Sequence, residues 1–312
     1  MMKKWLRNTG AVLSAGGIGV YTVYRIVFVR SKKNQSFEYE MPQGKQYDPY
    51  AEMIQKNLDT VRELPFQQVF IEAKDGTTLA AAYYHFKDGA PVFVFFHGYH
   101  GSALRDGNGI LLYARKEGYN ILLVNQRAHG RSGGKAITFG IRERYDCLEW
   151  IEYINRRFGE KTEIILAGIS MGASTVLMAA ELGLPANVKG IIADCPFSSP
   201  KEILQAVMKQ MKFPVHVTYA AVKLGAKVFG GFDVEEASAL EAMEHCKVPV
   251  LFVHGDADYF VPCEMSRRCY EACISPQKKL VLVKGAAHAI SYCVDGELYE
   301  KELTEFIEKI LI

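Results

Sequence analysis

The sequence predicts an α/β protein built on a mostly parallel sheet of eight strands, with helices on both faces. Short, wholly apolar runs recur along the chain, such as PVFVFF (91–96) and PVLFVHG (249–255). Stretches with helical spacing of apolar residues separate these runs. Continuous apolar strands that alternate with helices are typical of parallel strands buried on both faces.

The elements follow one another in a regular order. Residues 31–48 are polar and irregular, and residues 49–64 have the apolar spacing of a helix. Residues 67–85 predict two strands joined by a hairpin turn at Asp75-Gly76, because Asp-Gly between apolar runs is a strong hairpin signal. Beyond the hairpin we predict strands over 91–96, 120–124, 163–168, 188–194, 249–255 and 279–283, and helices near 103–117, 141–158, 171–182 and 295–311.

Residues 198–245 interrupt this rhythm. They form 48 residues without a clear core strand, apolar and moderately basic, with Gly and Pro scattered through them. An insertion of this length inside a compact domain is usually functional. We predict a helical lid, which either contacts a membrane or only covers the site.

The N-terminus predicts a membrane anchor. Residues 10–29 carry a single charge, Arg25, and 20 apolar residues suffice to cross a bilayer core of about 30 Å. A cleaved signal peptide would have a shorter apolar region and a small-x-small cleavage site, whereas a buried core helix is the other alternative. We expect a single-pass anchor over 1–30 and a juxtamembrane linker and helix over 31–66. Three basic residues precede the span and four lie at or after its end, so the side of the membrane stays open.

The charge distribution argues against nucleic-acid binding. The first 37 residues hold seven basic side chains and no acidic one, which leaves 30 basic and 35 acidic side chains in the remainder. A nucleic-acid-binding domain would carry a basic stripe on its folded body. The seven cysteines include no C-x-x-C pair, so we expect buried free thiols rather than a zinc site or a disulfide framework.

A serine, an acid and a histidine each follow a predicted strand. Ser170 lies in GISMGAS directly after the strand over 163–168, and glycines two residues away on either side indicate a cramped turn. Asp256 and Asp258 follow the strand over 249–255, and His288 follows the strand over 279–283. Ligands bind at the carboxyl ends of the strands in such sheets. The chain order Ser, Asp, His is that of enzymes with a nucleophile elbow.

The chain resembles the serine α/β-hydrolases, in particular the branch similar to serine aminopeptidases and monoacylglycerol lipases. The resemblance lies in five segments in the right order: FFHGYHG (95–101), NQRAHGRSGG (125–134), GISMGAS (168–174), HGDADYFVP (254–262) and GAAHAIS (285–291). It implies an α/β-hydrolase domain over 67–312 with its lid at about 198–245. The first 66 residues lie outside it.

The resemblance also implies the roles of the site residues. Ser170 would be the nucleophile and His288 the base that takes its proton. The acid that orients His288 would be Asp258 rather than Asp256, and Asp194 after the sixth strand is a third candidate.

The oxyanion donors would be the backbone N–H groups of Tyr99 and Met171. We expect no metal and no cofactor, because the other histidines are scattered without a cluster of acids. The residues expected to brace loops are His97, His100, His129, His254, Arg127 and Arg131.

The leading functional hypothesis is hydrolysis of carboxylic esters, including lipid-like acyl esters, through an acyl-serine intermediate. The partners would be a small-molecule ester or acyl substrate and the membrane, with no obligatory protein partner. An alternative is a serine aminopeptidase or amidase, whose acidic group for a substrate amine would come from Asp233, Glu235 and Glu236 in the lid. A further alternative is a catalytically silent, membrane-anchored binding module.

Overall fold

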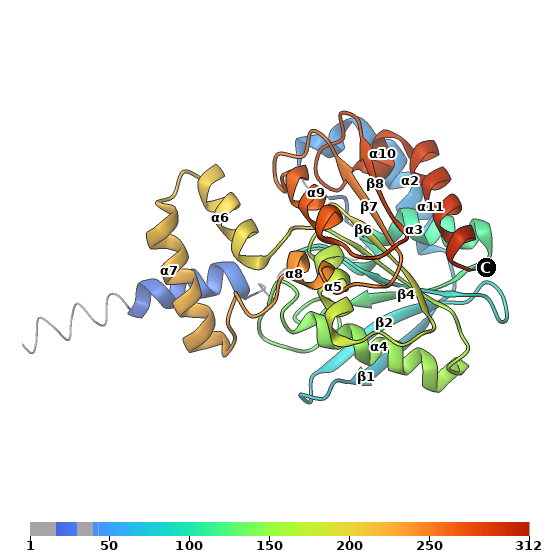
Figure 1. The fold of residues 1–312 in the computed structure, drawn as a ribbon, viewed down its shortest axis with the longest axis horizontal. Helices are drawn as coiled ribbons and strands as arrows, with labels where there is room; N and C mark the ends of the chain where they lie inside the picture. Colours follow the sequence, from blue (N-terminus) through green and yellow to red (C-terminus); the bar gives the residue numbers. More distant parts are fainter. Residues whose placement is uncertain (1–16, 30–39, 43, 312) are drawn as a thin grey trace, which may run out of the picture.

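The protein is built around one twisted sheet with helices packed on both faces (Figure 1). The computed structural model describes residues 17–29, 40–42 and 44–311. The described part of the chain forms an eight-stranded sheet in the order β1-β2-β4-β3-β5-β6-β7-β8. The pairs β1–β2 and β2–β4 are antiparallel and the other pairs are parallel. The predicted fold class is therefore confirmed.

The strands and helices alternate along the chain, as expected from the apolar runs. The strands are β1 (Gln67–Glu72), β2 (Thr78–Tyr84), β3 (Val92–Phe96), β4 (Asn120–Asn125), β5 (Ile164–Ile169), β6 (Val188–Asp194), β7 (Val250–Gly255) and β8 (Lys278–Val283). On one face lie α4 (Glu143–Phe158), α5 (Met171–Ala179), η3 (Ala180–Leu182), α8 (Ala239–Met243) and α9 (Cys263–Ala272). On the other face lie α2 (Ala51–Arg62), which follows η2 (Lys45–Tyr50), and α3 (Ala103–Glu117), α10 (Ser291–Val294) and α11 (Gly296–Ile310).

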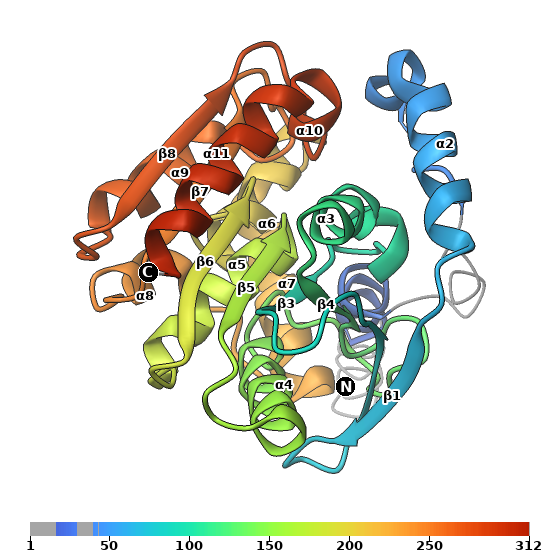
Figure 2. The ribbon, with the colours of Figure 1, turned by 90° about the vertical axis from the view of Figure 1, so that its right-hand side faces the viewer.

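The sheet divides the core into two halves because side chains alternate along each strand. In β3, Val94 and Phe96 pack on the α4/α5 side, whereas Phe93 and Phe95 pack on the α3/α11 side. All five residues of β3 are buried. Figure 2 shows α3 and α11 in front of the sheet, with α2 beyond α3. The cavity beside Ser170 lies in this second half of the core.

The predicted hairpin turn forms at Asp75-Gly76. Gly76 has φ 78°, a left-handed conformation that glycine adopts without strain. The Asp75 carboxylate accepts a hydrogen bond from the Thr77 N–H (3.0 Å), and Glu72 pairs with Thr78 across the turn. A short local sequence thus sets the register of β1 and β2.

The predicted membrane anchor is wrong. Among residues 17–29, 40–42 and 44–311, no helix has both the length and the apolar character needed to cross a membrane. The single-pass N-terminal anchor and the membrane localisation are therefore overturned, and residues 10–16 of the expected span lie outside the described residues.

The described part of this N-terminal run packs against the body instead. Residues 17–28 are helical, and the rings of Tyr24 and Phe28 are 6% and 0% exposed. The Phe28 ring meets those of Phe139 and Phe232 edge-on, with centroids 5.9 and 5.2 Å apart. The Ile137 N–H donates to the Phe28 carbonyl (2.7 Å). Tyr24 and Phe28 thus join the protein core, whereas Ile18, Tyr21 and Ile26 on the same helix stay exposed.

The insertion over 198–245 is helical. It contains α6 (Pro200–Gln210), α7 (Val215–Gly225), η4 (Ala226–Gly230) and α8. Figure 1 shows residues 17–28 beside α7. A Cβ atom on Gly225 would lie 3.0 Å from the Tyr24 Cβ, so the two helices approach closely where α7 has no side chain.

Candidate active site

Ser170 occupies a strained turn between β5 and α5. Its φ of 53° and ψ of −117° are unfavourable for a residue with a side chain. The glycines on either side permit this turn. A Cβ on Gly172 would lie 2.0 Å from the Phe96 carbonyl oxygen, and a Cβ on Gly168 would lie 2.4 Å from the Gly172 backbone. The turn thus presents Ser170 at the carboxyl end of the sheet, as a nucleophile elbow requires.

The structure brings Ser170, Asp258 and His288 together. His288 Nε2 lies 2.9 Å from Ser170 Oγ, and His288 Nδ1 lies 2.7 Å from Asp258 Oδ2. A charged carboxylate can only accept, so Nδ1 carries the proton and Nε2 is left to accept from the serine hydroxyl. The arrangement can activate the hydroxyl as a nucleophile.

Asp258 is held as a charged group. Burial alone would raise its pKa, but hydrogen bonds from His254 and His288 outweigh burial and lower the pKa to about 2. Its other oxygen accepts from the backbone N–H groups of Phe260 (2.9 Å) and Val261 (2.8 Å). The carboxylate is therefore fixed in place as well as charged.

The other two candidate acids lie elsewhere. Asp256 accepts a hydrogen bond from the Gly285 N–H (2.6 Å) and so joins the loops after β7 and β8. Asp194 accepts from the Tyr299 hydroxyl (3.0 Å), and burial raises its pKa to about 6. The hydrogen bond to His288 is made by Asp258.

Two further side chains lie beside the acid: His254, which the sequence predicted to brace a loop, and Cys195, which it did not indicate. His254 shares its Nε2 between the Val261 carbonyl (2.9 Å) and Asp258 Oδ2 (3.2 Å), which braces the loop that carries the acid. Cys195 is buried with φ 45°, and its thiol lies within 4.8 Å of ligand atoms of Asp258 and His288. The sequence around Cys195 does not indicate that its thiol lies near the site, because a single cysteine after a strand forms no motif. All seven cysteines are free thiols.

The two residues expected to supply oxyanion donors, Tyr99 and Met171, both lie near Ser170. Met171 is the first residue of α5, so its N–H has no acceptor within the helix. Negative charge is favoured at this end of a helix. Tyr99 lines the same cavity as Ser170. The Tyr99 hydroxyl donates to the Val27 carbonyl (2.7 Å), so its side chain ties the N-terminal helix to the site.

A mostly apolar cavity of about 200 Å³ opens beside Ser170 and His288. Its lining includes residues of β3, β5 and β6 and of α3, α10 and α11. Among the described residues of 198–245, none belongs to its lining. The insertion meets the rim only indirectly, because Gln210 of α6 donates to the carbonyl of Phe260 (3.2 Å), whose ring lies 5.0 Å from that of His288.

The acidic residues expected to hold a substrate amine are paired with basic side chains, and Asp233 lies 3.8 Å from Lys223. Glu235 pairs with Lys223 (2.6 Å) and Lys201 (3.2 Å), and the hydrogen bond from Lys223 lowers its pKa to about 2. Glu236 pairs with Arg144 (3.4 Å). These acids are not among the residues that line the cavity.

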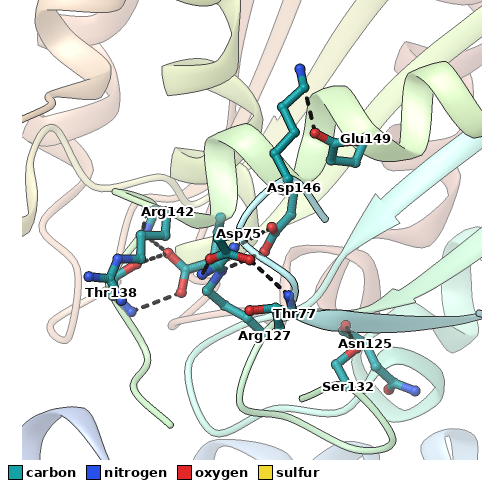
Figure 3. Close-up of polar contacts among 12 residues, drawn as sticks. Asp75, Thr77, Asn125, Arg127, Ser132, Thr138, Arg142, Asp146 and Glu149 are labelled. Carbon is teal, nitrogen blue, oxygen red and sulfur yellow. Dashed lines mark hydrogen bonds and ion pairs between the residues drawn. The ribbon is translucent and has the colours of Figure 1, made fainter. Parts of the chain in front are cut away.

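The loop after β4 is fastened by a buried arginine (Figure 3). Arg127 donates twice to Asp146 of α4 (2.7 and 2.5 Å) and once to Asp75 in the hairpin turn (2.9 Å). The Arg127 and Asp146 side chains are 5% and 3% exposed, whereas Asp75 is 47% exposed. Arg127 therefore braces the loop, as expected, and lies outside the lining of the cavity.

Comparison with known families agrees with this geometry. A model of the α/β hydrolase fold matches residues 91–248, half of the chain, and a model of the serine aminopeptidase S33 family matches residues 236–292. The chain belongs to the α/β hydrolase family.

Individual relatives cover most of the chain. An uncharacterized protein YqkD of Bacillus subtilis is 25% identical over 99% of this chain and 98% of its own length. The bifunctional esterase/perhydrolase DCH of Acinetobacter calcoaceticus is 23% identical over 76% of this chain and 99% of its own. Among solved structures, the Pyrococcus furiosus esterase PF2001 superposes with a TM-score of 0.65 at 24% identity, covering 80% of this chain and 93% of its own.

Proposed function

We propose that the protein is a serine esterase that cleaves carboxylic esters through an acyl-Ser170 intermediate. The observation that carries the proposal is the hydrogen-bonded series Asp258–His288–Ser170 beside a mostly apolar cavity that Ser170 and His288 line. The similarity to enzymes named as esterases supports the same class of reaction.

The reaction follows from the geometry. Ser170 Oγ attacks the ester carbonyl while His288 Nε2 takes its proton, and Asp258 stabilises the imidazolium that forms. The N–H groups of Tyr99 and Met171 stabilise the oxyanion. The tetrahedral intermediate collapses, the bond to the alcohol breaks, and His288 returns the proton to the leaving oxygen. Water then attacks the acyl carbonyl while His288 takes its proton. The bond to Ser170 Oγ breaks, His288 returns the proton to Oγ, and the carboxylic acid leaves.

Residues 67–312 would form the catalytic domain, with 198–245 as its lid. The contact between Gln210 and the Phe260 carbonyl links α6 to the rim of the site. The peptidase alternative is less well supported, because Glu235 and Glu236 are paired with cations away from the cavity.

Hydrolysis of p-nitrophenyl esters from acetate to palmitate by the full chain tests the proposal. We expect turnover that falls by on the order of 10⁴-fold or more in Ser170→Ala. Ser199→Ala is the matched control, because Ser199 only caps α6 through the Glu202 N–H. Undiminished turnover in Ser170→Ala, or a folded wild-type protein that hydrolyses none of the esters, would overturn the proposal.

A further inference from the structure

Part of the wall of the cavity comes from the N-terminal segment. Besides the strands and helices of the hydrolase body, the lining includes Pro42, Tyr47 and Ile54. These three residues precede the segment that matches the α/β hydrolase fold, which begins at residue 91. The segment that the sequence indicated to be a linker therefore reaches the substrate cavity.

This segment is packed firmly in place. The side chains of Ile54, Leu58 and Val61 along α2 are 4%, 0% and 1% exposed. Asn57 donates to Asn108 of α3 (3.2 Å), and α2 lies against α3 (Figure 2). Burial of one face of α2 fixes η2 beside the cavity, so this wall is part of the folded site before substrate arrives.

Tyr47 is the largest side chain that the segment contributes to the cavity. It is half-buried against the α3/α11 half of the core. Burial raises the pKa of its hydroxyl, and the nearby charge of Asp106 raises it further, as does Cys195. Asp106 accepts a hydrogen bond from the Gly98 N–H (2.9 Å) next to the expected oxyanion donor, and the Cys195 thiol lies within 4.8 Å of ligand atoms of Asp258 and His288. The Tyr47 side chain is thus part of the wall of the cavity that also contains Ser170 and His288.

We propose that Tyr47 sets the length of the acyl chain that the enzyme accepts, because its side chain forms part of the wall of the cavity beside Ser170. This inference rests on the proposed esterase function. The cavity of about 200 Å³ is mostly apolar, which suits the alkyl chain of an acyl group. The acyl group stays attached to Ser170 while the alcohol leaves, so the walled space beside Ser170 is its natural place.

The chain-length profile of the full-length enzyme tests this role. Tyr47→Ala removes the ring and should raise the ratio of kcat/KM for the laurate ester over the hexanoate ester by about 10-fold, since each methylene in an apolar pocket changes selectivity by this order. Tyr47→Trp should lower the ratio, and Tyr47→Phe should keep it within about twofold of wild type. Tyr50→Ala is the matched control, because Tyr50 packs on the same core half but does not line the cavity.

A merely structural role for Tyr47 gives a different result. It would lower kcat/KM for all esters by the same factor and leave the ratio unchanged, and this outcome would overturn the proposal. The same change of ratio in Tyr50→Ala would also overturn it, since the effect would not come from the cavity wall.

Ligand binding separates this inference from the proposed reaction. In the Ser170→Ala background, unreactive 2-alkanones of six to twelve carbons should raise the melting temperature by mass action. The best-binding length should increase when Tyr47→Ala is added. This test needs no turnover, so it supports or overturns the wall even if no ester is hydrolysed. An unchanged optimum would overturn the role of Tyr47 and leave the proposed reaction untouched.

Discussion

The packing of the N-terminal helix predicts a large effect from a residue that hydropathy places in a membrane span. Phe28 is completely buried among the rings of Tyr24, Phe139 and Phe232. Replacing a fully buried phenylalanine by alanine costs about 3–5 kcal/mol, from lost transfer free energy and the cavity left behind. We therefore expect Phe28→Ala to lower the free energy of unfolding by this amount and the melting temperature by about 5–8 °C.

Urea unfolding of the full chain, followed by circular dichroism, measures this change. Ile26→Ala is the matched control on the same helix, because Ile26 is 68% exposed and should change stability by no more than about 0.5 kcal/mol. Phe28→Leu should recover about half of the loss, since it refills part of the space. Equal stabilities of Phe28→Ala and Ile26→Ala would refute the reasoning, because they would show that the helix does not contribute to the core.

Three further predictions concern the charged groups. Asp258→Asn should lower kcat on p-nitrophenyl esters by about 10⁴-fold with little change in KM. The control Asp256→Asn should leave kcat within a few-fold of wild type. Equal losses of kcat in the two variants, measured in steady-state assays, would contradict the choice of Asp258 as the acid. The folded-state pKa of Asp258 is lowered from 3.8 to about 2, so its carboxylate stabilises the fold above pH 4, and this contribution of about 2 kcal/mol is lost as the pH falls from 4 toward 2. Urea unfolding at pH 5 and pH 3 should accordingly show a weaker pH dependence in Asp258→Asn, and parallel pH dependence in the two proteins would argue against a charged, buried acid. Asp146→Ala leaves the buried Arg127 without its bidentate partner and should cost about 3–5 kcal/mol, whereas Asp75→Ala removes a half-exposed partner and should cost about 1 kcal/mol or less. Similar losses of unfolding free energy in these two variants would show that burial does not decide the strength of the pairs.

The alternation of strands and helices could be predicted because it depends on local spacing. The strand that ends at Ile169 and the glycines around Ser170 together indicate the turn, and the structure explains why those positions exclude a Cβ. Asp256 and Asp258 are two residues apart in one loop, and residue types alone cannot rank them. The fold of that loop decides between them: the Asp258 carboxylate is hydrogen-bonded to His288, whereas the Asp256 carboxylate accepts a hydrogen bond from the Gly285 N–H.

The misread segments depend on contacts that are distant in sequence. Tyr24 and Phe28 look the same to hydropathy whether their neighbours are lipid chains or Phe139 and Phe232. The helix α9 was not anticipated, because its buried positions include Ser266 and Cys269, which give only a weak apolar pattern. Likewise, no local feature of Tyr47 indicates that it faces a cavity formed by residues from across the sheet.

The central claim is that His288 makes Ser170 a nucleophile, and covalent labelling of the full chain tests it most directly. A fluorophosphonate, read by intact mass and peptide mapping, should add one equivalent to the peptide that contains Ser170. The adduct should be absent in Ser170→Ala, much slower to form in His288→Gln, and unchanged in Ser199→Ala. A folded protein that takes up no label, or that carries the label on another residue, would contradict the account.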